Sequence, residues 1–151
     1  MNILTLGLNS FRIDEEIKDY LLQIDGVKDV TFTSDETKEN IVIKYDEKVV
    51  SIKRLKGEVL LFIDAYNSPI VVTFDKHSND NLISYEFIVK DACCEICLSQ
   101  FFEELLLVDG IEKASVDYDD SMFNVSINIE YNPRKISEKE ILDLQNKFKY
   151  L

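Results

Sequence analysis

Several residue types are scarce in this chain, and each shortage removes a class of function. The 151 residues include one histidine, His77, and three cysteines, all within positions 93–97. An odd number of clustered cysteines does not make a disulfide framework, so reduced thiols are expected. A Cys/His zinc knuckle is also excluded, because there is no second cysteine pair and His77 lies far back in the sequence.

Long apolar runs are also missing. No apolar stretch approaches the ~20 residues needed to span a bilayer. Residues 1–8 are apolar, but they have no basic start and no small-residue cleavage site, so no targeting segment is expected. We therefore expect a cytoplasmic protein that does not insert into a membrane.

Basic residues are few compared with acidic ones. The chain has 17 Lys and Arg against 29 Asp and Glu, a formal net charge of −12 at pH 7. This balance excludes nucleic acid as a partner, because the phosphate backbone is bound through Lys and Arg. No acid–base pair, Ser/His/Asp set or phosphate-binding Gly loop is visible, so the chain is not expected to be an enzyme.

The sequence contains two diverged copies of one unit. Residues 21–27 (LLQIDGV) match residues 105–111 (LLLVDGI) at an offset of 84. Residues 43–46 (IKYD) match residues 129–132 (IEYN) at an offset of 86. The repeat predicts two similar domains, 1–76 and 81–151, joined by polar residues 77–81.

Each copy shows the pattern of a small α+β domain. Apolar periods of 3.6 and 2 alternate along the chain, Gly26 lies where a helix should end, and Ser51 lies where the next should begin. We predict two tandem ferredoxin-like βαββαβ sandwiches, each an antiparallel sheet with two helices on one face. In the second copy only residues 149–151 remain for the last strand, which leaves a short sheet edge that either is covered by a partner or a homodimer or has no significance. The predicted strands are 2–8, 27–33, 40–45, 70–74, 82–89, 112–118 and 124–131, and the predicted helices are 14–24, a segment after Ser51, 97–108 and 137–148.

The cysteines lie where the strand 82–89 is predicted to become the helix 97–108. A helix N-terminus stabilises negative charge and therefore favours thiolates. Cys94 and Cys97 form a CxxC pair, which suits a soft ion such as Cu(I). The same pair is compatible with a thiol redox protein, or with a scaffold or regulatory module in which the cysteines have no chemical role.

The second copy resembles the heavy-metal-associated (HMA) domain family of copper chaperones and of the amino ends of metal-transporting P-type ATPases. Cys94 and Cys97 match the paired ligands of that family, and Gly110-Ile111 matches the Gly-Val that ends its first helix. The resemblance covers residues 82–151. Its other landmarks are Tyr131, the segment 136–141 that opens the second helix, and Lys149-Tyr150 in place of Gly-Tyr.

The chain departs from the family pattern around the cysteines. Asp91 replaces a Gly, Ala92 replaces a Met, and Cys93 is additional. Cys93 is either a third ligand or a solvent-facing bystander. As a third ligand, with oxygen from Asp91 or Glu95, it would suit Zn(II) or Cd(II) better than a linear Cu(I) site.

The resemblance also assigns roles outside the cysteine pair. Tyr150 corresponds to a residue near the metal loop, where it would either support the ligands or be a packed aromatic at a helix end. In the first copy, Ser10 and Ile13 stand where Cys94 and Cys97 stand in the second, so that copy is expected to be a degenerate HMA-like domain without metal. The sequence thus predicts binding of one soft metal ion, Cu(I) or Zn(II)/Cd(II), and its transfer to an acceptor such as a metal-transporting ATPase.

Overall fold

The computed structural model describes residues 1–151 except 10–14, 36–37, 65–69, 91–94, 117–123 and 149–151. The chain divides into two compact units, Met1–Val71 and Val72–Leu151. Four helices and seven strands occur in the described residues, and the strand pairs within each unit are antiparallel, which confirms the predicted α+β class. None of the helices in these described ranges has the length and apolar character required to cross a bilayer.

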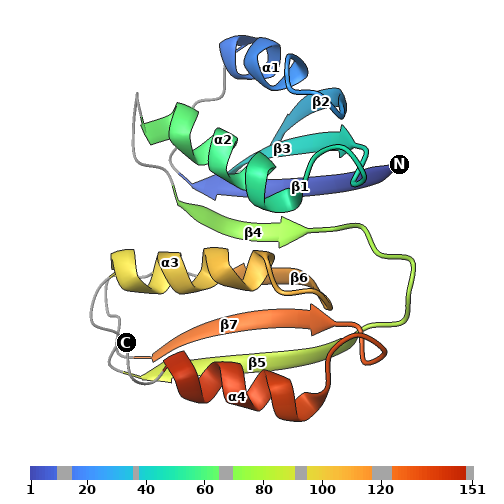
Figure 1. The fold of residues 1–151 in the computed structure, drawn as a ribbon. Helices are drawn as coiled ribbons and strands as arrows, with labels where there is room; N and C mark the ends of the chain where they lie inside the picture. The colour runs from blue at the N-terminus through green and yellow to red at the C-terminus, as the bar shows by residue number, and fades with distance from the viewer. Residues whose placement is uncertain (10–14, 36–37, 65–69, 91–94, 117–123, 149–151) are drawn as a thin grey trace. The chain divides into compact units, whose positions relative to one another are not determined.

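The first unit packs two helices on a small sheet. Its elements are β1 (Asn2–Asn9), α1 (Glu15–Leu22), β2 (Val27–Ser34), β3 (Lys38–Tyr45) and α2 (Ile52–Asp64). The strands lie in the order β2-β3-β1, and both helices lie on the same side of them (Figure 1). Apolar residues at strand and helix periods meet between the two layers, which forms the core. Its buried side chains include Leu4, Leu6, Leu8, Ile17, Leu21, Ile41, Ile43, Leu55 and Val59.

The second unit repeats this arrangement with one strand added in front. Its elements are β4 (Val71–Asp75, which begins at the unit boundary), β5 (Ile83–Lys90), α3 (Glu95–Leu106), β6 (Ile111–Val116), β7 (Asn124–Tyr131) and α4 (Glu138–Phe148). The strands lie in the order β4-β6-β7-β5. Both helices again cover one face (Figure 1). The core includes Phe74, Phe87, Leu98, Phe102, Leu105, Ile111, Ile127, Ile129 and Ile141.

The two units repeat the same backbone details after their first helix. Gly26 and Gly110 both have positive φ, 96° and 102°. The carbonyl of Gly26 accepts the Asp46 N–H at 2.8 Å, and that of Gly110 accepts the Asn132 N–H at 2.7 Å. The register of β2 shifts directly after this point, between Val27 and Asp29, and that of β6 shifts at the equivalent residues, 111 and 113. The sequence repeat therefore corresponds to a repeat in hydrogen bonding.

The second helix of each unit begins at a serine. The Oγ of Ser51 accepts the Arg54 N–H at 3.1 Å, as the sequence predicts. In the second unit, Ser137 Oγ accepts the Glu140 N–H at 3.2 Å, and the Glu140 carboxylate accepts the Ser137 N–H at 3.0 Å. This reciprocal pair is a capping box, which satisfies two backbone donors at the start of α4.

The strand β4 pairs with β6 of the second unit. Thr73, Phe74 and Asp75 stand opposite Ser115, Ala114 and Lys113. The sequence assigns this strand to the first copy, and the residue before it does bond that unit, because the Ile70 carbonyl accepts the Asn9 N–H at 3.2 Å. The limits 1–76 and 81–151 stay a prediction.

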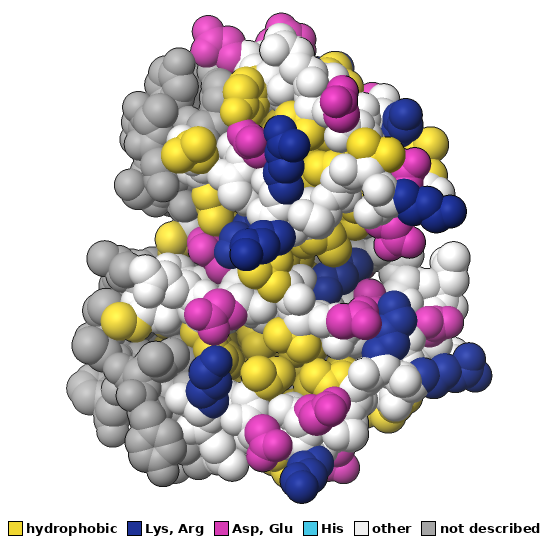
Figure 2. Space-filling model, viewed as in Figure 1, with side chains coloured by type: hydrophobic (Ala, Val, Ile, Leu, Met, Phe, Trp, Pro, Cys, Tyr) yellow, Lys and Arg dark blue, Asp and Glu magenta, His cyan; other side chains and the backbone are white. Residues whose placement is uncertain are grey.

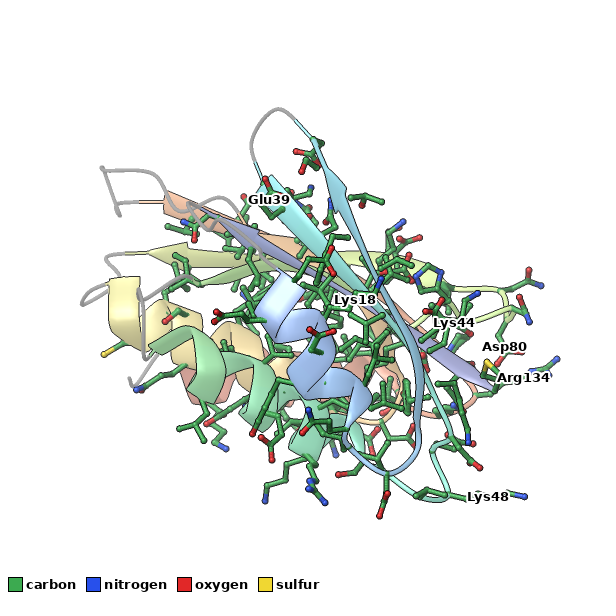
Figure 3. All side chains as sticks on the ribbon, turned by 90° about the horizontal axis from the view of Figure 1, so that it is seen from above. Lys18, Glu39, Lys44, Lys48, Asp80 and Arg134 are labelled. Atoms are coloured by element: carbon green, nitrogen blue, oxygen red, sulfur yellow. The ribbon has the colours of Figure 1, made fainter. Side chains whose placement is uncertain are left out.

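The polar segment after β4 is held by hydrogen bonds within the second unit. The Asp80 carboxylate accepts the Nδ2–H of Asn132 at 2.7 Å. Asn132 is buried, and its Oδ1 accepts the Arg134 N–H at 3.0 Å. Figure 3 shows Asp80 and Arg134 at the same end of this unit. The segment predicted as a linker is therefore fastened at Asp80.

One residue of the apolar stripe on α1, Tyr20, lies at the surface. The helical period places Tyr20 with Ile17, Leu21 and Ile24, but 37% of Tyr20 is exposed, while the other three are buried. Its hydroxyl donates a hydrogen bond to Glu58 on α2, and this bond raises the pKa of Tyr20. A phenol at the margin of the helical stripe can keep its oxygen in contact with solvent, so burial of its ring is not required.

Candidate metal centre

The candidate site lies between the end of β5 and the start of α3. β5 reaches this junction through the buried Phe87 and Val89 and ends at Lys90, and α3 begins at Glu95. This confirms that the cysteine segment connects a strand to a helix. The predicted helix start at Cys97 is two residues late, because the helix already includes Glu95 and Ile96.

The helix that carries Cys97 is fixed by a large apolar face. Leu98, Phe101, Phe102 and Leu105 are all at most 3% exposed. The Phe102 ring lies 5.5 Å from that of Phe74, measured between ring centroids. Burying each such side chain contributes roughly 1.5–3 kcal/mol, so the position of α3 is strongly determined.

Cys97 is the third residue of α3 and is half-buried. Backbone N–H groups in the first turn of a helix have no partner within the helix, and the dipole places partial positive charge there. A thiolate at this position is therefore electrostatically favoured.

The second unit has three more residues in this stretch than the first. Strand registers make Asn9 equivalent to Lys90, because both pair with the first residue of the following hairpin strand, Lys38 and Asn124. Ile17 follows Asn9 by eight positions, and Phe101 follows Lys90 by eleven. The extra length, close to one helical turn, falls in the segment that contains the cysteines. An alignment based on the strand registers therefore differs from the ungapped match that places Ser10 and Ile13 opposite Cys94 and Cys97.

Most predicted site residues lie outside the described part of the chain. These are Asp91, Cys93, Cys94 and Tyr150. Glu95 opens α3, but its side chain is not described either. Within the described ranges no group of three His, Cys, Asp or Glu side chains could hold a metal ion. The ligand set therefore stays a prediction, and the structure places one of its members, Cys97, at the helix start.

A charged cluster at the opposite end of α3 was not predicted. The Nζ of Lys76 donates a hydrogen bond to the Val108 carbonyl at 3.1 Å, and the Lys76 N–H donates to the Glu112 carbonyl at 2.8 Å. Glu112 is only 6% exposed, and its carboxylate lies 3.6 Å from the Lys135 Nζ. Burial lowers the pKa of Lys76 to about 8.

This cluster fastens the turn that follows α3, because Val108 lies two residues after Leu106, the last residue of the helix. The Val108 carbonyl also accepts the Ile111 N–H at 3.3 Å, so the lysine joins the hydrogen-bonded turn that leads from α3 into β6. The sequence contains no signal for it, because Lys76 and Val108 are 32 residues apart and meet only through the pairing of β4 with β6.

The surface around these elements carries charges of both signs. In each unit, acidic and basic side chains are interspersed on the face shown in Figure 2. Examples in the second unit are the ion pairs Lys113–Glu130 at 3.7 Å and Lys135–Asp109 at 3.7 Å. The charged side chains on this face are therefore mixed in sign.

No protein-family model matches the chain, and no curated protein matches it. Among solved structures, the chain is similar to the solution structure of the N-terminal soluble domains of Bacillus subtilis CopA. The sequence identity is 17% and the TM-score is 0.36, with 96% of this chain and 87% of that chain covered. At this TM-score the likeness carries no argument about function.

Proposed function

We propose that the second unit is an HMA-like, ferredoxin-like domain that binds one soft metal ion through Cys94 and Cys97. The observation that carries the proposal is the position of Cys97 in the first turn of α3, directly after β5. Cys94 precedes it by three residues, so both thiols belong to one strand-to-helix junction. The buried face of α3 holds the helix that carries Cys97 against the core.

The chemistry follows from the residue types. Thiolates are the preferred ligands of soft ions, and they must be deprotonated to bind. The helix N-terminus favours that deprotonation. Two thiolates alone suit Cu(I), whereas a third from Cys93 with oxygen from Asp91 or Glu95 suits Zn(II) or Cd(II).

The biological role we propose is delivery, transport or detoxification of the ion, without catalysis. A site with few protein ligands allows an incoming thiolate to join the ion before the first ligands leave. The acceptor in this proposal is a metal-transporting ATPase or another cytoplasmic protein with thiolate ligands. The first unit, which has no cysteine, serves as a degenerate HMA-like domain that packs or contacts a partner.

The test is anaerobic titration of the reduced full-length chain with Cu(I), Zn(II) and Cd(II) against competing chelators. We expect one-to-one binding that Cys94→Ser and Cys97→Ser each weaken by at least ~100-fold, because each removes one of the few thiolates. Cys93→Ser is the matched control at the adjacent position. A selective loss of Zn(II) and Cd(II) affinity in Cys93→Ser would identify a third ligand, and an unchanged titration would identify a bystander.

The rival interpretations give different results in the same set of proteins. A thiol redox protein would form a reversible Cys94–Cys97 disulfide and reduce partner disulfides, with no ion bound more tightly than a small dithiol binds it. A scaffold module would show neither property, and a Cys94→Ala/Cys97→Ala variant would behave as the parent protein does. Either result would refute the metal-binding proposal.

A further inference from the structure

The strand β5 is paired on one side among the residues that the structure describes. Its eight residues pair with β7 without any register shift, from Ile83 opposite Tyr131 to Lys90 opposite Asn124. In the order β4-β6-β7-β5 it is the last strand. The other side of β5 therefore presents N–H and C=O groups that a further strand could pair with.

The equivalent strand of the first unit has neighbours on both sides. β1 pairs with β3 along its length. At its end, the Asn9 N–H donates to the Ile70 carbonyl at 3.2 Å, and the Asn9 Oδ1 accepts the Ile70 N–H at 3.0 Å. The repeat thus shows that this edge of the unit can accept an extended segment.

The edge of β5 lacks the usual protection against pairing. Natural edge strands are commonly guarded by a bulge, a proline or several charges. β5 has no register shift and no proline, and its charged residues are Glu86 and Lys90. Ile83 and Ile88 are each 46% exposed. Such a strand is long, regular and apolar enough to bind another strand.

We propose that β5 pairs antiparallel with β5 of a second copy of this chain, giving a homodimer through a continuous sheet. A two-fold axis perpendicular to the sheet places one residue of the strand opposite itself. If the axis passes through Glu86, two like charges lie opposite each other. If it passes through Phe87, Glu86 lies opposite Ile88. Centring on Ile88 sets the two isoleucines together.

The register centred on Ile88 is also complementary in charge. It places Glu86 of each copy opposite Lys90 of the partner subunit, twice in one dimer. Direct cross-strand pairs of opposite charge and of β-branched residues both stabilise antiparallel sheets. Ser84, Glu86 and Ile88 lie on the exposed face of β5, opposite the buried Phe87 and Val89. The self-complementary sequence is the reason for choosing a second copy as the occupant.

The test is sedimentation velocity of the full chain over a range of concentrations, in reducing buffer with a chelator. The chelator and a Cys93→Ser/Cys94→Ser/Cys97→Ser background exclude dimers that share a metal ion, so this test is independent of the metal-binding proposal. We expect a dimer that Ile88→Lys and Glu86→Lys each weaken by about tenfold or more, because they place like charges across the pair. The double variant Glu86→Lys/Lys90→Glu should restore it.

Leu61→Lys is the matched control. Leu61 is an apolar residue on α2 of the first unit with 68% of its surface exposed, and its substitution should leave dimerisation unchanged. Circular dichroism checks that each variant is folded, and concentration-dependent exchange protection of the β5 amides tests the unsubstituted chain directly. A chain that is monomeric throughout, a dimer indifferent to Ile88→Lys, or a failure of the double variant to restore pairing would each overturn the proposal.

Discussion

Replacing Gly110 by alanine should destabilise the second unit strongly. Gly110 has a φ of +102°, and a Cβ built on it would lie 2.7 Å from Ile136 Cγ2 and 3.0 Å from Ile136 Cβ. The first conflict is conformational, because L-residues with a side chain are disfavoured at positive φ by roughly 1–2 kcal/mol. The second is steric, because Ile136 is buried and belongs to the turn that Asn132 organises.

The two effects together set the expected magnitude. Overpacking in a well-packed site typically costs about 1–3 kcal/mol. Added to the backbone strain, this gives a loss of roughly 2–5 kcal/mol, a large share of the ~5–15 kcal/mol that stabilises a typical domain. Gly26→Ala should behave alike in the first unit, since its φ is +96° and its Cβ would lie 2.9 Å from Val49 Cβ and from Val50 Cγ1.

Gly57→Ala provides the control with the opposite sign. Gly57 lies within α2, and a Cβ built on it meets no atom within 4 Å apart from its chain neighbours and the backbone of its own helix. Alanine should therefore stabilise the helix by about 0.5–1 kcal/mol.

The assay is urea unfolding with far-UV circular dichroism, combined with amide hydrogen exchange to identify the unit affected. Gly110→Ala should increase exchange in β6 and β7, and Gly26→Ala in β2 and β3. If Gly110→Ala were as stable as the parent chain, the reasoning from its backbone angle and its contacts with Ile136 would be refuted.

Two further predictions concern the turn after α3 and the start of α4. Burial lowers the pKa of Lys76 from 10.5 to about 8, so between these pH values the unfolded chain holds a proton that the native protein has lost, and stability rises with pH. Relative to a Lys76→Met variant, the free energy of unfolding should rise by about 3 kcal/mol across this window. If urea unfolding gave the same difference between the two proteins at every pH, the lowered pKa of Lys76 would be contradicted. Ser137→Ala removes the capping box of α4 and should cost about 1 kcal/mol, which thermal unfolding can measure; no loss would show that the two hydrogen bonds with Glu140 do not stabilise the helix.

The sequence predicted the local structure well where a residue type has one strong conformational use. Gly26 and Gly110 were recognised at helix ends, where positive φ is needed, and the structure has them there. Ser51 was recognised as a helix start, and β7 was predicted with its observed limits, 124–131. These predictions succeeded because they depend on neighbouring residues alone.

Burial was harder to predict at the margins of the core. Tyr20 fits the apolar stripe of α1 but remains exposed, since α2 offers Glu58 as a partner for its hydroxyl. Ile83 and Ile88 belong to an apolar run that resembles a buried strand, yet both are 46% exposed. Glu112 shows the reverse, because this charged residue is buried while the Lys135 ammonium, 3.6 Å from its carboxylate, stays exposed.

The candidate site was predictable in part. The clustering of cysteines and the strand-to-helix pattern are properties of the sequence, and the position of Cys97 in the first turn of α3 agrees with them. Two things stay predictions, because they depend on residues outside the described ranges. These are the geometry of Cys94 relative to Cys97 and the roles of Cys93, Asp91 and Tyr150.

By itself the sequence determined the α+β class, the internal repeat and the succession of elements, because periodicity, glycine and serine act over a few residues. Only the tertiary structure decided that β4 pairs with β6, that Lys76 reaches the turn after α3, and that β5 lies at the end of the second unit's strand order. Strand partners lie tens of residues apart, and any apolar strand carries the same backbone donors and acceptors. The choice among partners therefore depends on which faces can be buried together in three dimensions.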